Sequence, residues 1–321
     1  MRKISVGVTQ VALKGATSEP FEVLRSRMLD AHATLVAQAA AKGVNIIGFQ
    51  EVFNQAYFCP SRDPKWFACA ESIPDGPTVR FVSDLARRHE MVIVAPIYEI
   101  GDDGNYYCAA AVIDADGTYL GKYRKVHIRN APTSGKGIER LFFSNGNLGY
   151  PVFQTRYARV GVYICFDRHF PEGFRALGLN GAQVVFNPSA TSVNLSEYIW
   201  RIEQPAAAVA NGFYVCTNNR VGVEEPWTFG RFYGSSYIVS PDGEILAMGG
   251  RDEDELVSSQ IDLDLVDEAR RRWNIFESRQ ASTYTSLLSD PEPLACVRGP
   301  ESWRPANPAA TAGPDGGRTT P

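Results

Sequence analysis

The feature that most constrains the fold is a repeated order of predicted secondary-structure elements. Apolar runs typical of buried strands alternate with amphipathic stretches typical of helices, and a hairpin follows. In the first half of the chain these elements lie at 4–10, 21–41, 44–51, 78–89, 91–99 and 109–125. In the second half they lie at 160–167, 171–180, 182–190, 196–211, 213–222 and 235–248. Both hairpins contain an Asp-Gly pair, a strong signal for a tight turn.

This repeat predicts the fold class. Alternating strands and helices favour a mostly parallel sheet in each half, with helices on one face. Because two helices cover only one face of a sheet, the remaining faces must be buried against each other. The sequence therefore predicts an α/β fold, a four-layer α-β-β-α sandwich with internal pseudo-duplication. We expect residues 1–288 to form one domain with a C-terminal arm at about 252–288, and we expect the Pro- and Gly-rich tail at 298–321 to be disordered.

Composition narrows the classes of partner. The net charge of −4 argues against nucleic acid and against an anionic membrane, since both favour a basic face. No apolar run reaches about 18 residues, so we expect no membrane span. The six cysteines are irregularly spaced and follow no secretion signal, which predicts free thiols and a cytoplasmic location. With four histidines and neither CxxC nor HExxH, we expect no metal site and no cofactor.

Four reactive side chains lie at or between the ends of predicted elements, where α/β folds bind ligands. Glu51 ends a strand that should be buried, Lys125 follows the first hairpin, and Cys165 ends the first strand of the second half. Glu139 lies in the irregular stretch between the halves. Taken singly, each has an ordinary explanation, because strand-end charges are usually solvated and a cysteine is usually a small buried apolar group.

Together these residues match one chemistry. A thiol becomes a nucleophile when it ionises, and a nearby cation and the positive end of a helix that starts at Pro171 are expected to lower the pKa of Cys165. A carboxylate can accept the proton and later activate water. An ammonium and a backbone N–H can hold the oxyanion of a tetrahedral intermediate. The set predicts hydrolysis of an amide or carbamoyl group through a thioester.

Three motifs, in this order, make the chain similar to the nitrilase superfamily of carbon–nitrogen hydrolases. They are GFQEVF with Glu51, YRKVHI with Lys125 and VYICFDRHFPE with Cys165. The resemblance covers about residues 4–285 and implies the same four-layer sandwich. It also implies that Glu51 is the general base, Lys125 the oxyanion stabiliser and Cys165 the nucleophile. Assembly into a homodimer or a larger homo-oligomer is a further implication.

The resemblance extends to four more residues. Glu139 precedes a Phe-Phe pair, as the family's second glutamate precedes a similar pair, and would orient Lys125 or the substrate. Phe166 would lend its backbone N–H to the oxyanion. Arg168 and His169 occupy the place of a basic pair in relatives that hydrolyse N-carbamoyl amino acids, and they would bind the substrate carboxylate.

The hypothesis from the sequence is hydrolysis of the carbamoyl C–N bond of an N-carbamoyl amino acid, with a small molecule as the only partner besides further copies of the chain. The products would be the amino acid, ammonia and carbon dioxide. Three alternatives stay open: an N-carbamoyl-D-amino acid hydrolase or other aliphatic amidase, acyl transfer to an amine, and a non-catalytic oligomeric binding protein. The segment 128–138 is longer than expected for the family and is predicted to be a mobile entrance loop.

Overall fold

The structure is a computed structural model that describes residues 2–129, 139–193, 195–227 and 229–288. The predicted disordered tail at 298–321 lies outside these residues, as does most of the predicted entrance loop at 128–138. One compact unit spans Met1–Glu277. A second unit begins at Ser278, and its described part contains two short 3₁₀ helices, η4 (Ala281–Thr283) and η5 (Thr285–Leu288).

The first half of the chain, together with β14 from near the other end, forms a six-stranded sheet with the order β14-β1-β2-β3-β4-β5. Strands β1, β2 and β3 are parallel, because α1 and α2 connect them, whereas β4, β5 and β14 run antiparallel to their neighbours. The bounds are β1 (Lys3–Gln10), α1 (Phe21–Ala41), β2 (Ile46–Gly48), η1 (Pro64–Cys69), α2 (Pro77–His89), β3 (Val92–Ile100), β4 (Tyr106–Ile113), β5 (Tyr119–Arg124) and β14 (Glu255–Asp262).

The second half repeats this arrangement in a sheet with the order β13-β12-β9-β8-β7-β6. Strands β7, β8 and β9 are parallel, and β12, β13 and β6 are antiparallel to their neighbours. The bounds are β6 (Val152–Gln154), β7 (Arg159–Val162), η2 (Cys165–His169), α4 (Pro171–Leu179), β8 (Val184–Pro188), η3 (Glu197–Ile199), α5 (Glu203–Asn211), β9 (Tyr214–Asn218), β12 (Tyr237–Val239) and β13 (Ile245–Met248). The predicted pseudo-duplication is confirmed, down to one antiparallel edge strand beside the first strand of each half.

The remaining elements lie outside the two large sheets. They are α3 (Glu139–Phe142), the two-stranded pair β10 (Val221–Gly222) and β11 (Phe232–Tyr233), and α6 (Asp264–Trp273). The helix predicted at 196–211 is divided into η3 and α5, and Pro205 lies in the first turn of α5, where a missing N–H is tolerated.

The start of the predicted arm at 252–288 belongs to the first sheet. Strand β14 pairs with β1 along its whole length, from Lys3 opposite Asp262 to Gln10 opposite Glu255. Leu256, Val257 and Ile261 of this strand are buried. The charged flanks of the stretch favour a helix in the sequence, and the partner strand lies at the opposite end of the chain, so local pattern does not reveal the pairing.

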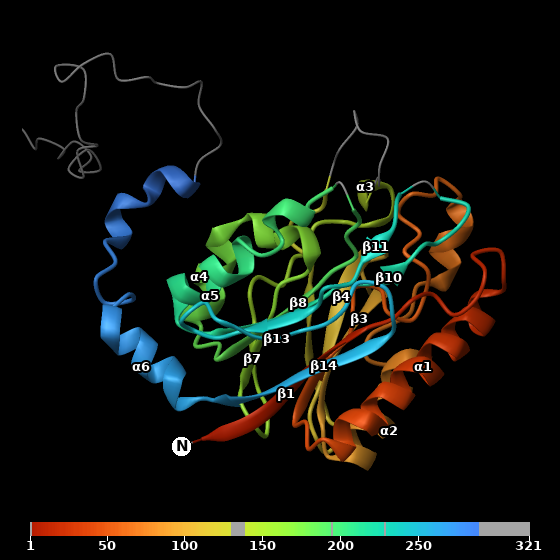
Figure 1. Cartoon of the computed structure of the whole chain (residues 1–321). Coiled ribbons are helices and arrows are strands. Elements are labelled where there is room, and N and C mark those ends of the chain that lie inside the picture. Colours follow the sequence, from red (N-terminus) through yellow and green to blue (C-terminus); the bar gives the residue numbers. More distant parts are fainter. Residues whose placement is uncertain (1, 130–138, 194, 228, 289–321) are drawn as a thin grey trace, which may run out of the picture. The chain divides into compact units, whose positions relative to one another are not determined.

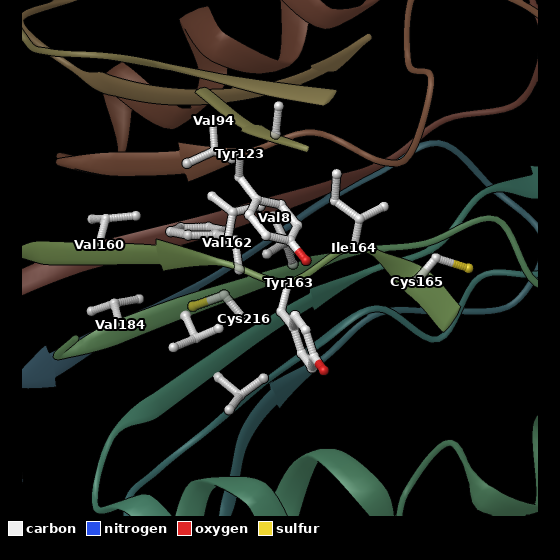
Figure 2. Close-up of a cluster of buried hydrophobic side chains, with 14 of the residues drawn as sticks. Val8, Val94, Tyr123, Val160, Val162, Tyr163, Ile164, Cys165, Val184 and Cys216 are labelled. Carbon is white, nitrogen blue, oxygen red and sulfur yellow. The ribbon is translucent and has the colours of Figure 1, made fainter. Parts of the chain in front are cut away.

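The two sheets bury one face against each other and are covered by helices on their outer faces. Strands β1 and β14 contact β9, β12 and β13, and Figure 2 shows Val8 and Val94 of the first sheet in one cluster with Val162 and Val184 of the second. Figure 1 shows α1 and α2 on one side of the paired sheets and α4 and α5 on the other. The predicted four-layer α-β-β-α sandwich is thereby confirmed.

Replacement of Gly48 by alanine should lower the free energy of unfolding by about 1–3 kcal/mol, as overpacking of a core does. A Cβ on Gly48, in β2, would lie 2.3 Å from the ring of Phe186, in β8 of the facing sheet. Chemical denaturation measures the loss, and the added change Phe186→Leu should recover part of it. The control is Gly7→Ala in the neighbouring strand, where the nearest atom is the flexible end of Leu256 at 3.2 Å. Equal losses in both variants would contradict the close contact between the sheets.

Candidate active site

The four residues predicted to be catalytic lie together although they come from four separate segments. Glu51 follows β2, Lys125 follows β5, Glu139 begins α3 and Cys165 begins η2. The Nζ of Lys125 donates to Oε1 of Glu51 at 2.8 Å and to both carboxylate oxygens of Glu139 at 2.9 Å. All four side chains are buried. Three segments that follow strands and the start of α3 therefore bring one thiol, one ammonium and two carboxylates into a single cluster.

The backbone at two of these positions has an unusual conformation. Cys165 has φ +47° and Val52, which follows Glu51, has φ +49°. This left-handed region is rare for residues with a side chain, and rarest for β-branched ones. Such conformations persist only where surrounding contacts hold them, and they cluster at functional sites. At Cys165, Nη1 of Arg168 donates to the carbonyl oxygen at 3.0 Å. In Figure 2 the chain leaves the inter-sheet cluster at Ile164, and the sulfur of Cys165 points away from it.

The two carboxylates around Lys125 have opposite pKa shifts. Burial opposes ionisation of Glu139, but the Lys125 ammonium and hydrogen bonds from Arg129 N and Tyr57 Oη outweigh it and lower the pKa of Glu139. Burial raises the pKa of Glu51, and Glu139 adds to this effect against the opposing effect of Lys125. Burial would lower the pKa of Lys125, but the two carboxylates raise it well above its usual range. Glu139 and Lys125 thus form a lasting ion pair, and Glu51 is the carboxylate suited to exchange a proton.

The two oxygens of the Glu51 carboxylate differ in their surroundings. Oε1 accepts from Lys125 and from the thiol of Cys108 in β4, at 3.5 Å. Oε2 is buried and accepts no well-formed hydrogen bond from the described residues. The Cys165 thiol is a hydrogen-bonding neighbour that lowers the pKa of Glu51. Oε2 is therefore the oxygen available to a proton from the thiol or from water, and Cys108 is a contact that no sequence signal distinguishes.

The prediction of a lowered thiol pKa is wrong for this structure. Burial and, after it, the Glu51 carboxylate raise the pKa of Cys165 to about 12 against the opposing effect of Lys125 and Arg168. Helix α4 begins at Pro171, as predicted, but Cys165 begins the separate 3₁₀ segment η2 (Cys165–His169), which precedes that helix. The thiol is thus protonated at neutral pH, and its ionisation requires a base. All five cysteines within the described residues are free and buried.

Asp167 connects the loop that carries Lys125 to the loop that carries Cys165. Its buried carboxylate accepts hydrogen bonds from Tyr123 Oη at 2.7 Å, from the backbone N–H of His127 at 2.8 Å and from that of Ile164 at 3.0 Å. Nδ1 of His127 also lies 2.8 Å from it. Tyr123 and His127 lie on either side of Lys125, and Ile164 precedes Cys165. Asp167 is a residue that the sequence analysis did not single out, although an acid inside a run that should be buried is itself a signal.

A cavity of about 450 Å³ opens onto the cluster. Glu139 and Cys165 line it, together with Phe166, Arg168 and His169, which were predicted to bind substrate. The side chains of Glu51 and Lys125 are wholly buried behind this lining. The structure thus brings all seven predicted site residues to one place, since five of them line the cavity and the other two belong to the same buried cluster.

The predicted basic pair shares an internal carboxylate. Nη2 of Arg168 donates to Ser196 Oγ at 2.8 Å, and its Nε lies 3.2 Å from Oε2 of Glu203. Nδ1 of His169 lies 2.6 Å from Oε1 of the same Glu203. The guanidinium also lies over the ring of Trp200. The charge of Arg168 is therefore balanced inside the protein, and the predicted contact with a substrate carboxylate stays a prediction.

Comparison with known proteins shows the family of this chain. Residues 10–271 match the family model described as carbon-nitrogen hydrolase. The chain belongs to the carbon–nitrogen hydrolase family. Among curated members, a beta-ureidopropionase from Arabidopsis thaliana is 35% identical over 303 residues, covering 90% of this chain and 73% of that protein. An N-carbamoylputrescine amidase from Solanum lycopersicum is 38% identical over 266 residues, covering 79% and 87% respectively.

The fold agrees with a solved structure of the family. The crystal structure of a carbon-nitrogen hydrolase from Helicobacter pylori G27 has a TM-score of 0.80 and 32% identity, and the match covers 89% of this chain and 99% of that one. Within the described residues, the hydrolase has no helix that is long and apolar enough to cross a bilayer.

Asp167→Asn should lower the free energy of unfolding by about 1–3 kcal/mol, because an amide N–H₂ would face donors that now bind a carboxylate oxygen. Denaturant titration measures this change. Asp242→Asn is the matched control, since Asp242 is exposed and pairs with the exposed Arg272, and its change should stay within about 0.5 kcal/mol. Similar small changes in both variants would contradict the connecting role of Asp167.

Proposed function

We propose that this hydrolase cleaves the carbamoyl C–N bond of N-carbamoyl amino acids, in the manner of a β-ureidopropionase (N-carbamoyl-β-alanine amidohydrolase), through a thioester on Cys165. The observation that carries the proposal is the cluster itself: a thiol at the cavity wall, a carboxylate of raised pKa behind it, and an ammonium between two carboxylates. The similarity to a beta-ureidopropionase and to an N-carbamoylputrescine amidase supports a carbamoyl substrate.

In the proposed first step, Sγ of Cys165 attacks the carbamoyl carbon while Oε2 of Glu51 takes the thiol proton. The new C–S bond turns the carbonyl oxygen into an oxyanion, which Lys125 Nζ and the backbone N–H of Phe166 stabilise. Because Nζ already donates to three carboxylate oxygens, the oxyanion takes the place of one Glu139 oxygen. The raised pKa of Glu51 suits this step, since a base of ordinary pKa would withdraw the proton less readily.

In the second step the intermediate collapses, and Glu51 gives its proton to the departing nitrogen as the C–N bond breaks. Glu51 then takes a proton from water, and the hydroxide attacks the thioester carbon. The C–S bond breaks, and the sulfur leaves with the proton returned by Glu51. Hydrolysis of the carbamoyl thioester releases a carbamic acid, whose remaining C–N bond breaks as it loses carbon dioxide. One water is consumed for each urea group, and the products are the amino acid, ammonia and carbon dioxide. An amine in place of water would give acyl transfer.

The substrate carboxylate is proposed to bind at Arg168 and His169, which line the cavity beside Cys165. Because Glu203 already balances Arg168, a neutral or cationic end is the second candidate, and N-carbamoylputrescine represents it. We also propose a homodimer or larger homo-oligomer, located in the cytoplasm. The strongly exposed side chains of Tyr198 (79%) and Ile202 (60%) support an assembly surface, and light scattering tests it.

A substrate panel tests the proposed function. Ammonia release is measured on N-carbamoyl-β-alanine, N-carbamoyl-D-phenylalanine and N-carbamoylputrescine, and the highest kcat/KM is expected for the first. A higher value for one of the other two would transfer the assignment to that class. Absence of turnover on all three would refute carbamoyl hydrolysis.

Cys165→Ser should reduce kcat on the order of 1,000-fold or more, because a hydroxyl is a far weaker nucleophile with the same base. Glu51→Gln should cause a similar loss, since an amide cannot accept the proton. In the parent enzyme, kcat/KM should rise with pH through an apparent pKa above that of an ordinary glutamate, because Glu51 must be deprotonated to act and burial raises its pKa. An acid limb at or below the ordinary glutamate value, or an active serine variant, would contradict these roles.

Arg168→Leu should raise KM for N-carbamoyl-β-alanine more than tenfold by removing the partner of its carboxylate, an effect of about 1.4 kcal/mol. Initial rates on N-propylurea, which has no carboxylate, are the control. A loss confined to the carboxylate substrate supports binding at Arg168. Equal losses on both substrates would assign Arg168 only to the support of the Cys165 carbonyl.

A further inference from the structure

A wholly buried guanidinium lies directly behind the turn that carries Glu51. Arg220 follows β9 and is 0% exposed. Its Nη2 donates to the carbonyl oxygens of Glu51 at 3.1 Å, Val52 at 2.5 Å and Gln55 at 2.7 Å. Its Nε donates to the Glu51 carbonyl as well, at 3.3 Å. One side chain therefore holds three carbonyls of a single turn, which is the arrangement that a buried cation needs to offset its desolvation.

The carboxylate partner of Arg220 holds the other end of the same segment. Nη1 of Arg220 lies 2.7 Å from Oε1 of Glu224, and the second oxygen of Glu224 accepts from the backbone N–H of Tyr57 at 2.6 Å. The Tyr57 hydroxyl in turn donates to Oε1 of Glu139 at 2.8 Å. The buried Arg220–Glu224 pair thus fixes residues 51–57 at both ends, and Tyr57 continues the hydrogen bonds to Glu139.

These contacts form a continuous hydrogen-bond network around Glu51, Lys125 and Glu139. Glu139 binds Lys125, and Lys125 binds the side chain of Glu51, whose backbone carbonyl binds Arg220. The backbone within the turn is strained, since Val52 is a β-branched residue at φ +49°. Without donors on its carbonyls, this turn would relax toward an ordinary conformation and carry the Glu51 side chain with it. Nothing in the sequence motif around Glu51 reveals a partner so far along the chain.

We propose that Arg220 is a positioning residue, which acts through the backbone of residues 51–55 to present the Glu51 carboxylate to Lys125 and Cys165, with Glu224 as its partner. Arg220 does not line the cavity among the described residues and reaches the chemistry only through Glu51. The inference rests on the proposed role of Glu51 as the base. A merely structural role would instead make Arg220 a support of the fold, with no specific effect on the thiol or on the base.

The first test needs no substrate. Carbamidomethylation of Cys165 by iodoacetamide is followed by peptide mass spectrometry across neutral and alkaline pH. In Arg220→Lys the charge is kept, but one ammonium cannot hold three carbonyls and Glu224. Retreat of Glu51 and entry of water should both lower the pKa of the thiol, because burial and Glu51 are the effects that raise it. The pH profile of the carbamidomethylation rate of Cys165 should therefore lie at lower pH than in the parent protein.

Arg270→Lys is the matched control for loss of a supporting arginine. Arg270 lies in α6, and its guanidinium likewise donates to two backbone carbonyls, of Ala182 and Asn211. Its replacement should change thermal stability and leave the alkylation profile of Cys165 unchanged. An unshifted profile in Arg220→Lys, or the same shift in both variants, would overturn the proposal.

The second test is kinetic and uses the substrate with the highest rate in the panel. Arg220→Lys should lower kcat on the order of 100-fold, as a displacement of about 1 Å does, with little change in KM. The acid limb of kcat/KM should move to lower pH, because entry of water weakens burial, which is the largest effect on the pKa of Glu51 and outweighs the opposing effect of Lys125. The other titratable groups that face Glu51 are Glu139 and the Cys108 and Cys165 thiols. A rise in KM alone, with kcat and the acid limb unchanged, would contradict the proposal.

A second variant keeps the proposal testable if Arg220→Lys does not fold. Glu224→Gln retains an oxygen for the Tyr57 N–H but removes the charge that orients Arg220. It should shift the alkylation profile and kcat in the same directions by smaller amounts. Unchanged values would refute the positioning role of Arg220. If the parent hydrolyses no member of the panel, the proposed function fails, while the alkylation profiles still decide the role of Arg220.

Discussion

A buried ammonium between two buried carboxylates is the interaction on which the site depends. Lys125 is withdrawn from water, and its charge is tolerable there because Glu139 binds it with both oxygens and Glu51 with one. The same geometry shifts the pKa values of the two acids in opposite directions. Glu139 is stabilised as an anion, whereas the raised pKa of Glu51 suits it to take and return a proton. The thiol, whose own pKa is raised to about 12, is useful only beside such a base.

The fold supplies this cluster from strand ends of both halves. Strand β2 delivers Glu51, β5 delivers Lys125, and β7 leads to Cys165, so the packing of the two sheets sets the distance between base and thiol. Asp167 fixes the Lys125 loop to the Cys165 loop, and Arg220 fixes the turn after β2. Two left-handed residues, Val52 and Cys165, lie at the points where these supports act. Buried polar contacts of residues next to the cluster thus stabilise the strained backbone at the site.

Local pattern was sufficient for most of the architecture but not for the electrostatics. Periodicity and the Asp-Gly turns predicted the repeated strands, and three motifs placed Glu51, Lys125 and Cys165 at neighbouring strand ends. The pairing of β14 with β1 could not be predicted from local pattern, because it joins opposite ends of the chain. The thiol pKa was predicted in the wrong direction because burial outweighs the nearby cations, and burial is a property of packing. The role of Arg220 could not be predicted either, because a sequence does not distinguish a buried arginine from an exposed one.

A double-mutant cycle on the central ion pair tests this account most directly. Unfolding free energies are measured for Lys125→Met, for Glu139→Gln and for the double variant. Lys125→Met leaves the buried Glu139 carboxylate without its ammonium and should cost about 3–5 kcal/mol. Glu139→Gln leaves Lys125 with Glu51 as its remaining carboxylate and should cost less, and the double variant should be more stable than the sum of the two losses allows. Strictly additive losses would show that Lys125 and Glu139 do not act as a buried pair, and the opposite pKa shifts of the two acids would then have no basis.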